Sequence, residues 1–296
     1  MRKGTRFLLF LSLLFLFNAE SGFLFCQSKS ISFRHYNIND GLSQNTVRSI
    51  FQDKQGFMWF GTKDGLNRFD GSSFKVFKFS PDSELQDNVF TRIVQDKNDN
   101  FWLGTEDGIY IYDPRAERFE QFALTTSDSI SLNGIVSDLL LDADGDVWIA
   151  VEEKGVFRYD FNAGKLTNYT IPSLPGGMKM ITLCAEKDGV WVFPYNLPFL
   201  RIDKGTGRLS EFRLNDDPAL LHQLGEVWKA KTDEYNQLLI SSSTQGLISI
   251  NTVSKTHRVL LNKDSSGNQI FARCIEKIDP RTIWVGSESG LYIYDT

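Results

Sequence analysis

One block of sequence recurs six times along the chain and limits the fold more than any other feature. It runs aspartate, a turn with Gly or Asn, tryptophan, small residues, glycine, an apolar stretch and aspartate, as in DKQGFMWFGTKDGLNRFD from Asp53. Further copies begin at Asp96, Asp142, Glu186, Asp233 and Ile278, the last three with a looser match. The anchor positions Trp59, Trp102, Trp148, Trp191, Leu239 and Trp284 lie 43, 46, 43, 48 and 45 residues apart. A period of this length predicts the blades of a β-propeller.

Each repeat is predicted to form one blade of four short antiparallel strands. In the first repeat we expect strands at 47–52, 57–61, 65–69 and 74–79, each bounded by turn residues. Small residues, which let neighbouring sheets approach closely, recur at Gly61, Gly104, Ala150, Ser241 and Gly286. The tryptophans at 59, 102, 148, 191 and 284 are therefore interpreted as structural residues that fill the gap between blades, rather than as platforms for sugar rings.

The two ends of the chain suggest how the ring closes. Residues 33–36 are similar to the expected fourth strands, and the last repeat stops at Asp295 after its third strand. A first segment that completes the last blade removes the open edge of a propeller. We therefore predict an all-β fold of six blades, with an N-terminal strand closing the last one. A further blade beyond Thr296 would make seven, and would make the chain a fragment of a longer protein.

The first residues resemble an export signal. Arg2, Lys3 and Arg6 precede an apolar run over 7–17 that is too short to span a bilayer. We predict a signal peptide over 1–28, with an uncertain cleavage site, and an exported propeller domain over 29–296. Cys26 allows a lipoprotein, although the bulky Phe25 before it is a poor match. The formal net charge of −5 argues against nucleic acid as a partner.

Two stretches carry a resemblance to a known family. GLSQNTVRSIFQDKQGFMWFGTKDGLNRFDG from Gly41 and VFTRIVQDKNDNFWLGTEDGIYIYD from Val89 resemble the propeller repeats of two-component regulators. Such repeats form the periplasmic half of Bacteroidetes hybrid sensor histidine kinases. The resemblance implies a periplasmic sensor module that detects a carbohydrate, acts as a homodimer through its parent protein, and signals by phosphorelay across an inner-membrane helix encoded downstream. It does not fix where the ligand binds.

The first strands of a propeller line its central channel, and one position in them is polar throughout. In register it reads Ser49, Arg92, Asp138, Thr182, Lys229 and Arg273. Such a ring suits an oligosaccharide entering along the axis, because guanidinium groups bind oxygen atoms in a fork. A merely water-filled channel explains the same residues. Tyr195 and Asn196 replace the usual Gly-Thr turn of the fourth repeat and offer a stacking face and an amide, although loop drift explains them too.

The residues that carry catalysis are sparse. His35, His222 and His257 have no spacing typical of a catalytic triad or a metal site. The turn from Asp142 to Asp146 looks like a calcium loop but lacks the next acidic ligand. We therefore expect no catalytic residues, no metal and no cofactor in this chain. Cys184 and Cys274 fall two blades apart, so we expect two buried, unpaired thiols.

A sensor module is thus the predicted function, with binding rather than turnover as its activity. Two alternatives remain open. An exported propeller enzyme, such as a lyase or glycoside hydrolase, would need His or carboxylates converging at the channel mouth, and a protein-interaction scaffold would show a large apolar patch.

Overall fold

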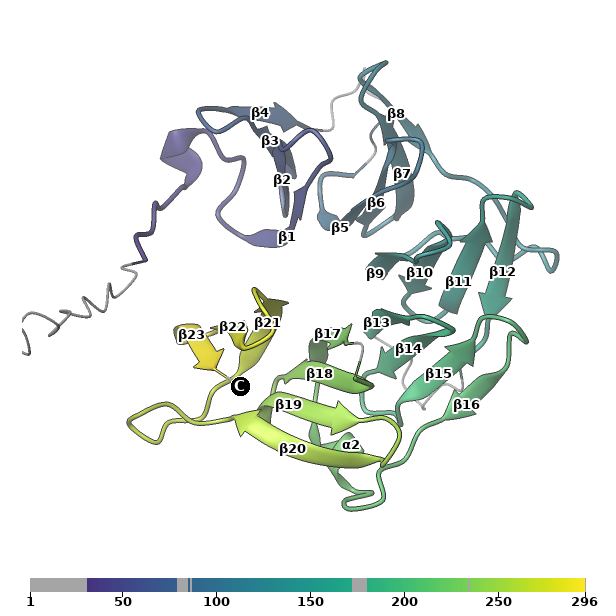
Figure 1. The fold of residues 1–296 in the computed structure, drawn as a ribbon. Coiled ribbons are helices and arrows are strands. Elements are labelled where there is room, and N and C mark those ends of the chain that lie inside the picture. The colour runs from purple at the N-terminus through teal and green to yellow at the C-terminus, as the bar shows by residue number, and fades with distance from the viewer. Residues whose placement is uncertain (1–30, 79–84, 86, 172–179, 234, 296) are drawn as a thin grey trace, which may run out of the picture. The chain divides into compact units, whose positions relative to one another are not determined.

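The computed structural model describes residues 31–78, 85, 87–171, 180–233 and 235–295. The predicted signal peptide over 1–28, including Cys26, lies outside the described residues. The chain divides into two units, one ending at Tyr36 and one that starts at Asn37. The second unit contains every strand of the described residues and is a six-bladed β-propeller of antiparallel sheets, as predicted (Figure 1).

The blades follow one another along the chain, with strands hydrogen-bonded in sequence order. Blade 1 contains β1 (Val47–Gln52), β2 (Met58–Thr62), β3 (Gly65–Phe69) and β4 (Phe74–Phe77). Blade 2 contains β5 (Phe90–Gln95), β6 (Phe101–Thr105), β7 (Gly108–Asp113) and β8 (Arg118–Gln121). Blade 3 contains β9 (Val136–Leu141), β10 (Val147–Val151), β11 (Gly155–Asp160) and β12 (Lys165–Tyr169).

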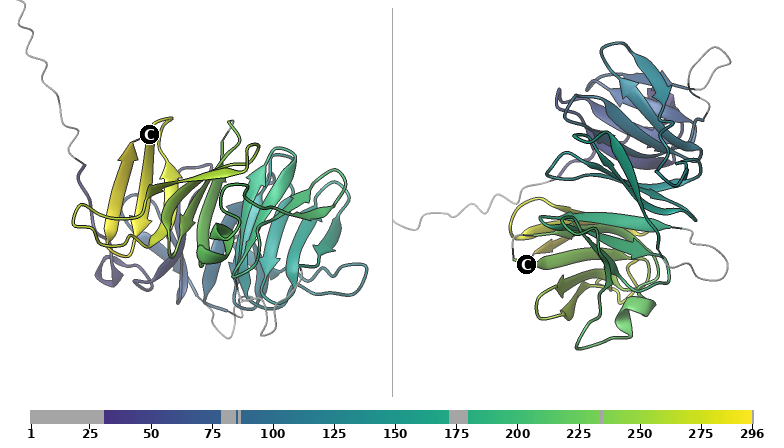
Figure 2. Two further views of the ribbon diagram at one scale, coloured as in Figure 1. Left: turned by 90° about the horizontal axis from the view of Figure 1, so that it is seen from below. Right: turned by 90° about the vertical axis from the view of Figure 1, so that its right-hand side faces the viewer.

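The second half of the propeller has the same order. Blade 4 contains β13 (Ile181–Glu186), β14 (Gly189–Pro194), β15 (Leu200–Asp203) and β16 (Leu209–Glu211). Blade 5 contains β17 (Val227–Thr232), β18 (Gln237–Ser242), β19 (Gly246–Asn251) and β20 (Thr256–Leu261). Blade 6 contains β21 (Ala272–Lys277), β22 (Thr282–Ser287) and β23 (Gly290–Asp295). A 3-10 turn, η1 (Ile38–Asp40), precedes β1, and the helix α2 (Leu220–Gln223), the green coil in Figure 2, precedes β17.

The first strands of the blades lie at the inside of the propeller. Each contacts the first strand of the next blade, from β1 through β5, β9, β13 and β17 to β21 (Figure 1). This placement agrees with the expectation that first strands face the axis. The third and fourth strands lie further out (Figure 1).

The core consists of layers between blades rather than one central mass. Between blades 1 and 2, Trp59 packs against Phe101, with ring centroids 4.7 Å apart. Between blades 2 and 3, Trp102 packs against Tyr159 at 5.3 Å. Four of the five repeated tryptophans, Trp59, Trp102, Trp148 and Trp191, are at most 2% exposed. Burial of these rings between sheets is the main apolar contribution to holding one blade against the next.

The small residues of the repeat stand where blades approach most closely. A Cβ atom on Gly104 would lie 2.8 Å from Val136 Cγ1 of the next blade. One on Gly61 would lie 2.9 Å from the Phe90 carbonyl oxygen. Neither distance leaves room for a side chain, so glycine sets the spacing between these sheets.

The expected N-terminal strand is wrong. Residues 31–37 contain no strand, and the sheet of blade 6 has three described strands, β21, β22 and β23. The alternating pattern over 33–36 suits any extended segment, whereas a strand also needs a partner that accepts and donates its backbone hydrogen bonds. The segment instead leads into η1, where Asn37 caps the turn and Gly41 ends it with a φ of 103°.

Candidate functional site

In blades 1, 2 and 3 the first aspartate of the repeat accepts hydrogen bonds from its own hairpin turn and from the tryptophan of its blade. Asp142 Oδ1 accepts hydrogen bonds from the backbone N–H groups of Asp144 and Asp146 at 2.9 and 3.0 Å. Asp142 Oδ2 accepts one from Trp148 Nε1 at 2.9 Å. The same arrangement joins Asp53 to Trp59 at 2.8 Å and Asp96 to Trp102 at 3.1 Å. The aspartate therefore satisfies a buried indole N–H that would otherwise be costly.

Blade 4 departs from this arrangement. Glu186 stands in the aspartate position and pairs directly with Gly189, so the turn is one residue shorter than in blade 3. The Glu186 carboxylate turns to Arg201 instead, with Oε2 2.7 Å from Nε. Trp191 is 2% exposed, and no described residue accepts a hydrogen bond from its Nε1. The tryptophan of blade 4 is thus packed like the others but lacks their acceptor.

A second change affects the gap between blades 4 and 5. In blades 3 and 4 the residue that directly follows the third strand, Phe161 and Lys204 respectively, lies against the preceding blade, and Thr252 stands at the same position in blade 5. Phe161 lies 5.7 Å from the ring of Trp102. Lys204 Nζ lies 3.3 Å from Asp142 Oδ2 and 2.6 Å from Asp144 Oδ2. Thr252 is too short to reach equivalently, and its hydroxyl donates to the Asn236 carbonyl at 3.2 Å.

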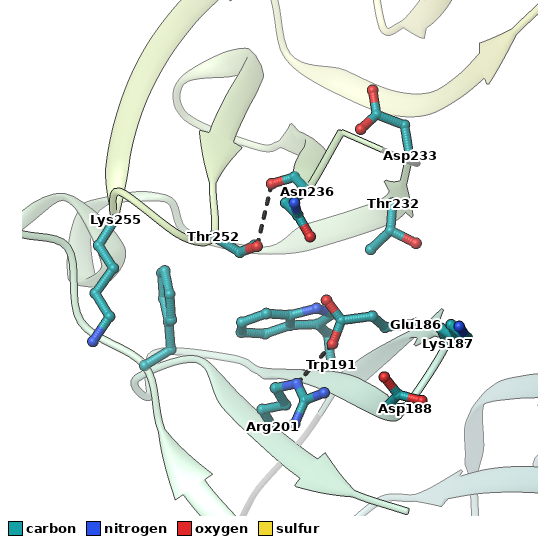
Figure 3. A pocket seen from close by; sticks show the side chains of 11 residues that line it. Glu186, Lys187, Asp188, Trp191, Arg201, Thr232, Asp233, Asn236, Thr252 and Lys255 are labelled. Carbon is teal, nitrogen blue, oxygen red and sulfur yellow. Dashed lines mark hydrogen bonds and ion pairs between the residues drawn. The ribbon is translucent and has the colours of Figure 1, made fainter.

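A cavity of about 610 Å³ occupies this gap. Figure 3 shows the indole of Trp191 with Arg201 and Glu186 on one side and Asn236 and Thr252 on the other. The full lining is Glu186, Lys187, Asp188, Trp191, Arg201, Phe212, Thr232, Asp233, Asn236, Thr252 and Lys255. We call it the blade 4–5 pocket. Its volume is in the range typical of small-molecule sites.

At the corresponding place between blades 3 and 4, an ion pair between Lys204 and Asp142 fills the gap. Burial opposes ionisation of Asp142, but hydrogen bonds from Trp148 and the Asp146 backbone, together with Lys204, outweigh it and hold the pKa of Asp142 below its usual range. Burial likewise opposes charge on Lys204, yet hydrogen bonds from it to Asp144 and Asp142 raise its pKa. Both groups are therefore charged at neutral pH, and the candidate calcium loop from Asp142 to Asp146 is occupied by a lysine.

A second cavity, of about 740 Å³, lies between blades 5 and 6. It is lined by Leu239, which replaces the tryptophan of the repeat, and by Tyr294 near the end of the chain. Its further lining includes Asp233, Lys277 and His257.

The predicted axial residues fall into two groups. Arg92 and Asp138 are paired, with Nε 2.8 Å from Oδ1, and Asp138 Oδ2 also accepts from the Leu183 backbone at 2.8 Å. Thr182 is buried and donates to the Val227 carbonyl at 2.5 Å. These side chains therefore link successive first strands.

The remaining axial residues are less constrained. Lys229 is exposed, and so is Arg273, whose guanidinium lies over the ring of Trp228 at 4.1 Å and pairs with Glu288. Ser49 Oγ is buried and has no partner among the described residues. The axial binding site stays a prediction, carried by Lys229 and Arg273 as its accessible charges.

The other two candidate residues lie in the turn that follows β14. Tyr195 is 38% exposed in the turn after β14, and Asn196 adopts a left-handed φ of 58° there. Neither lines the blade 4–5 pocket. Both thiols are free, but only Cys184 is buried; Cys274 is exposed, so the expectation of two buried thiols is wrong for Cys274. In the described residues no cluster of three or more His, Cys, Asp or Glu side chains is placed to hold a metal ion.

Sequence reasoning named Trp191 only as a packing residue and missed its unsatisfied N–H. The signal was present, because the aspartate-to-tryptophan spacing is six residues in the first three repeats and five between Glu186 and Trp191. The role of Thr252 could also be found by aligning the turns that contain Phe161 and Lys204. What the spacing could not show is that both changes border the same gap.

Within the described part of the chain, no helix combines the length and the apolar character that a membrane crossing requires.

Comparison with known proteins finds relatives that carry the same kind of repeat. The family model described as two component regulator propeller matches residues 41–64 and 84–107. Histidine kinase P4 of Formosa agariphila is 46% identical over 70 residues, which are 24% of this chain and 5% of that protein.

Two solved structures from B. thetaiotaomicron extend the similarity to the whole fold. The extracellular domain of one hybrid two component system is 25% identical with a TM-score of 0.70, covering 88% of this chain and 35% of the other. That of a second is 21% identical with a TM-score of 0.72, covering 90% and 37%. This chain therefore spans about a third of the length of these domains. Two of its repeats match the two component regulator propeller model, and over most of its length the chain is similar to the extracellular domain of a hybrid two component system.

Proposed function

We propose that this chain is the periplasmic ligand-receiving propeller of a hybrid two-component sensor and that its ligand is a carbohydrate. The observation that supports this most strongly is the similarity to the extracellular domain of a hybrid two component system, which extends over 88% of the chain. The repeats at 41–64 and 84–107 point to the same class of protein.

The mechanism proposed is binding rather than turnover. A ligand that binds one arrangement of a sensor dimer more tightly than another shifts the population toward it. The coupling free energy cannot exceed the difference between the two binding free energies. Signal transfer by phosphorelay then belongs to a kinase in the parent protein. Lys229 and Arg273 are the accessible charges with which the axial channel would contact a ligand.

The test is a transcription reporter for the operon next to the gene, in the native bacterium grown on a panel of single purified polysaccharides. We expect deletion of the propeller codons to abolish induction by one polysaccharide and leave growth on glucose unchanged. Unchanged induction on every polysaccharide would overturn the proposal. Turnover of a polysaccharide by the purified chain would favour the enzyme alternative instead, and capture of one defined periplasmic protein would favour the scaffold.

A further inference from the structure

The blade 4–5 pocket has the features of a binding site rather than of a packing defect. Its wall contains a buried hydrogen-bond donor, Trp191 Nε1, with no acceptor among the described residues. A buried polar group left unpaired costs about 1–3 kcal/mol, so it points to a partner supplied from outside the chain. In the first three blades an aspartate of the same blade supplies that acceptor.

Two side chains that fill the equivalent place between blades 3 and 4, the aspartate that bonds the tryptophan and the lysine of the next blade, are both lacking here. The shortened turn takes the Glu186 carboxylate to Arg201, and Thr252 stands where Lys204 fills the gap one blade earlier. Together these changes leave the indole edge of Trp191 bordering a volume of about 610 Å³ (Figure 3).

The missing partner must offer an acceptor oxygen. A carboxylate would meet three acidic residues as well as three basic ones in the same wall and would gain no net charge attraction, while an ammonium offers no acceptor at all. A hydroxyl accepts from the indole N–H and can donate its own proton to a neighbouring carboxylate. Hydroxyl groups therefore fit this wall better than either charged group.

The remaining wall suits an uncharged ligand with an apolar face. The three acidic residues are matched by three basic ones, Lys187, Arg201 and Lys255, so the wall has no net formal charge. Trp191 and Phe212 meet edge to face, with centroids 5.1 Å apart, and provide an apolar surface. Aromatic surfaces beside hydrogen-bonding groups favour molecules that carry both kinds of surface.

We propose that the blade 4–5 pocket binds a neutral pyranose unit, with one sugar hydroxyl accepting a hydrogen bond from Trp191 Nε1. The site lies between blades near the hairpin turns and is separate from the axial residues. It rests on the proposed function for the role of the sugar in signalling, whereas binding itself is tested independently.

The test uses the indole N–H signals of the secreted chain, labelled with ¹⁵N-tryptophan. Trp191→Phe removes one of the six indole signals and so identifies that of Trp191. The probes are the methyl glycosides of glucose, galactose and mannose, with methyl glucuronide and methyl glucosaminide as charged counterparts. We expect a neutral glycoside to move the Trp191 proton downfield, and the Trp148 signal to stay in place because Asp142 already accepts from it.

Two lysine variants then locate the sugar. Thr252→Lys rebuilds the side chain that fills the gap between blades 3 and 4, and we expect it to weaken binding at least tenfold. Ser254→Lys adds the same charge to an exposed position of the same turn, and we expect unchanged binding. The other indole signals report whether each variant is folded.

Three outcomes would overturn the assignment: no neutral glycoside moves the Trp191 signal, a charged glycoside moves it more strongly, or Thr252→Lys binds as the wild type does. If the polysaccharide response in the bacterium survives Thr252→Lys, the pocket assignment fails while the proposed function stands. If that response is absent even with the unaltered propeller, the proposed function fails, and a shifted Trp191 signal would still establish the pocket.

Discussion

Lys204 of blade 4 places its Nζ atom 3.3 Å from Asp142 Oδ2 of blade 3, the same oxygen that accepts a hydrogen bond from Trp148. The Lys204 side chain is 8% exposed and that of Asp142 is fully buried. This pair joins two blades through a buried charge on each side. The gap between blades 3 and 4 is filled by this pair, whereas the gap between blades 4 and 5 contains the blade 4–5 pocket.

Lys204→Met is expected to lower the free energy of unfolding by about 2 kcal/mol, because it leaves the buried carboxylate of Asp142 with fewer donors. Urea unfolding followed by tryptophan fluorescence measures this. Lys54→Met breaks an exposed pair with Asp99 and should cost less than about 1 kcal/mol. Equal losses in the two variants would contradict the role given to Lys204.

Asp138→Asn should destabilise the propeller by about 2–4 kcal/mol. The Asp138 carboxylate accepts hydrogen bonds from Arg92 and from the Leu183 backbone, and removal of its charge leaves Arg92 without its ionic partner. Glu211→Gln, which alters an exposed pair with Arg213, is the matched control and should change stability by less than about 1 kcal/mol. Chemical denaturation of both variants decides the point; a near-neutral Asp138→Asn would show that this buried ion pair is not structural.

Stability should fall in acid. Hydrogen bonds outweigh burial and hold the pKa of Asp142 below its usual range, and hydrogen bonds from Thr206 hold that of Asp203 low as well. A carboxyl group whose pKa is lower in the folded state stabilises the fold above its unfolded pKa of about 3.9. That contribution is lost as the pH falls through the folded pKa. Thermal melts between pH 7 and pH 2 should show a fall in Tm beginning near pH 4, and a Tm that rises over that interval would be inconsistent with these shifts.

The two described cysteines should differ in reactivity. Cys274 is exposed, whereas burial raises the pKa of the Cys184 thiol to about 12 and keeps it protonated. Because thiolate is the reacting form, iodoacetamide at pH 8 should modify Cys274 in the native chain and Cys184 only after unfolding. Peptide mass mapping reads both sites, and rapid native labelling of Cys184 would refute its burial.

Gly104→Ala should destabilise the fold by about 1–3 kcal/mol, because the added methyl group would lie 2.8 Å from Val136 Cγ1 and force blades 2 and 3 apart. Gly205→Ala is a useful contrast. Its new Cβ would lie 3.6 Å from Asp203 Oδ1, an ordinary contact, so we expect no loss of stability there. Differential scanning calorimetry of the pair separates crowding between blades from the general effect of replacing glycine.

The alternation of apolar and polar residues predicted the strands within blades correctly but not the structure of the N-terminal segment. The strand expected over 47–52 coincides with β1, and that over 65–69 with β3, because turn residues bound both segments. The segment 33–36 has the same alternation but forms no strand, since pairing depends on a neighbour that the segment itself does not specify. Cys274 was misplaced for a related reason: exposure of a first strand depends on what lies beside its sheet.

By itself the sequence determined the blade period, the four-strand pattern and the resemblance to two-component regulator propeller repeats, because these depend on spacing and on short motifs that are local along the chain. The tertiary structure decided which polar residues meet. Arg92 and Asp138 are 46 residues apart in sequence, and Lys204 and Asp142 are 62 apart, yet each pair is in contact. It also brought the shortened turn at Glu186 and the small side chain of Thr252 to the same gap. A pocket of this kind arises from side chains absent in two different blades, and only packing of those blades reveals the space that they leave.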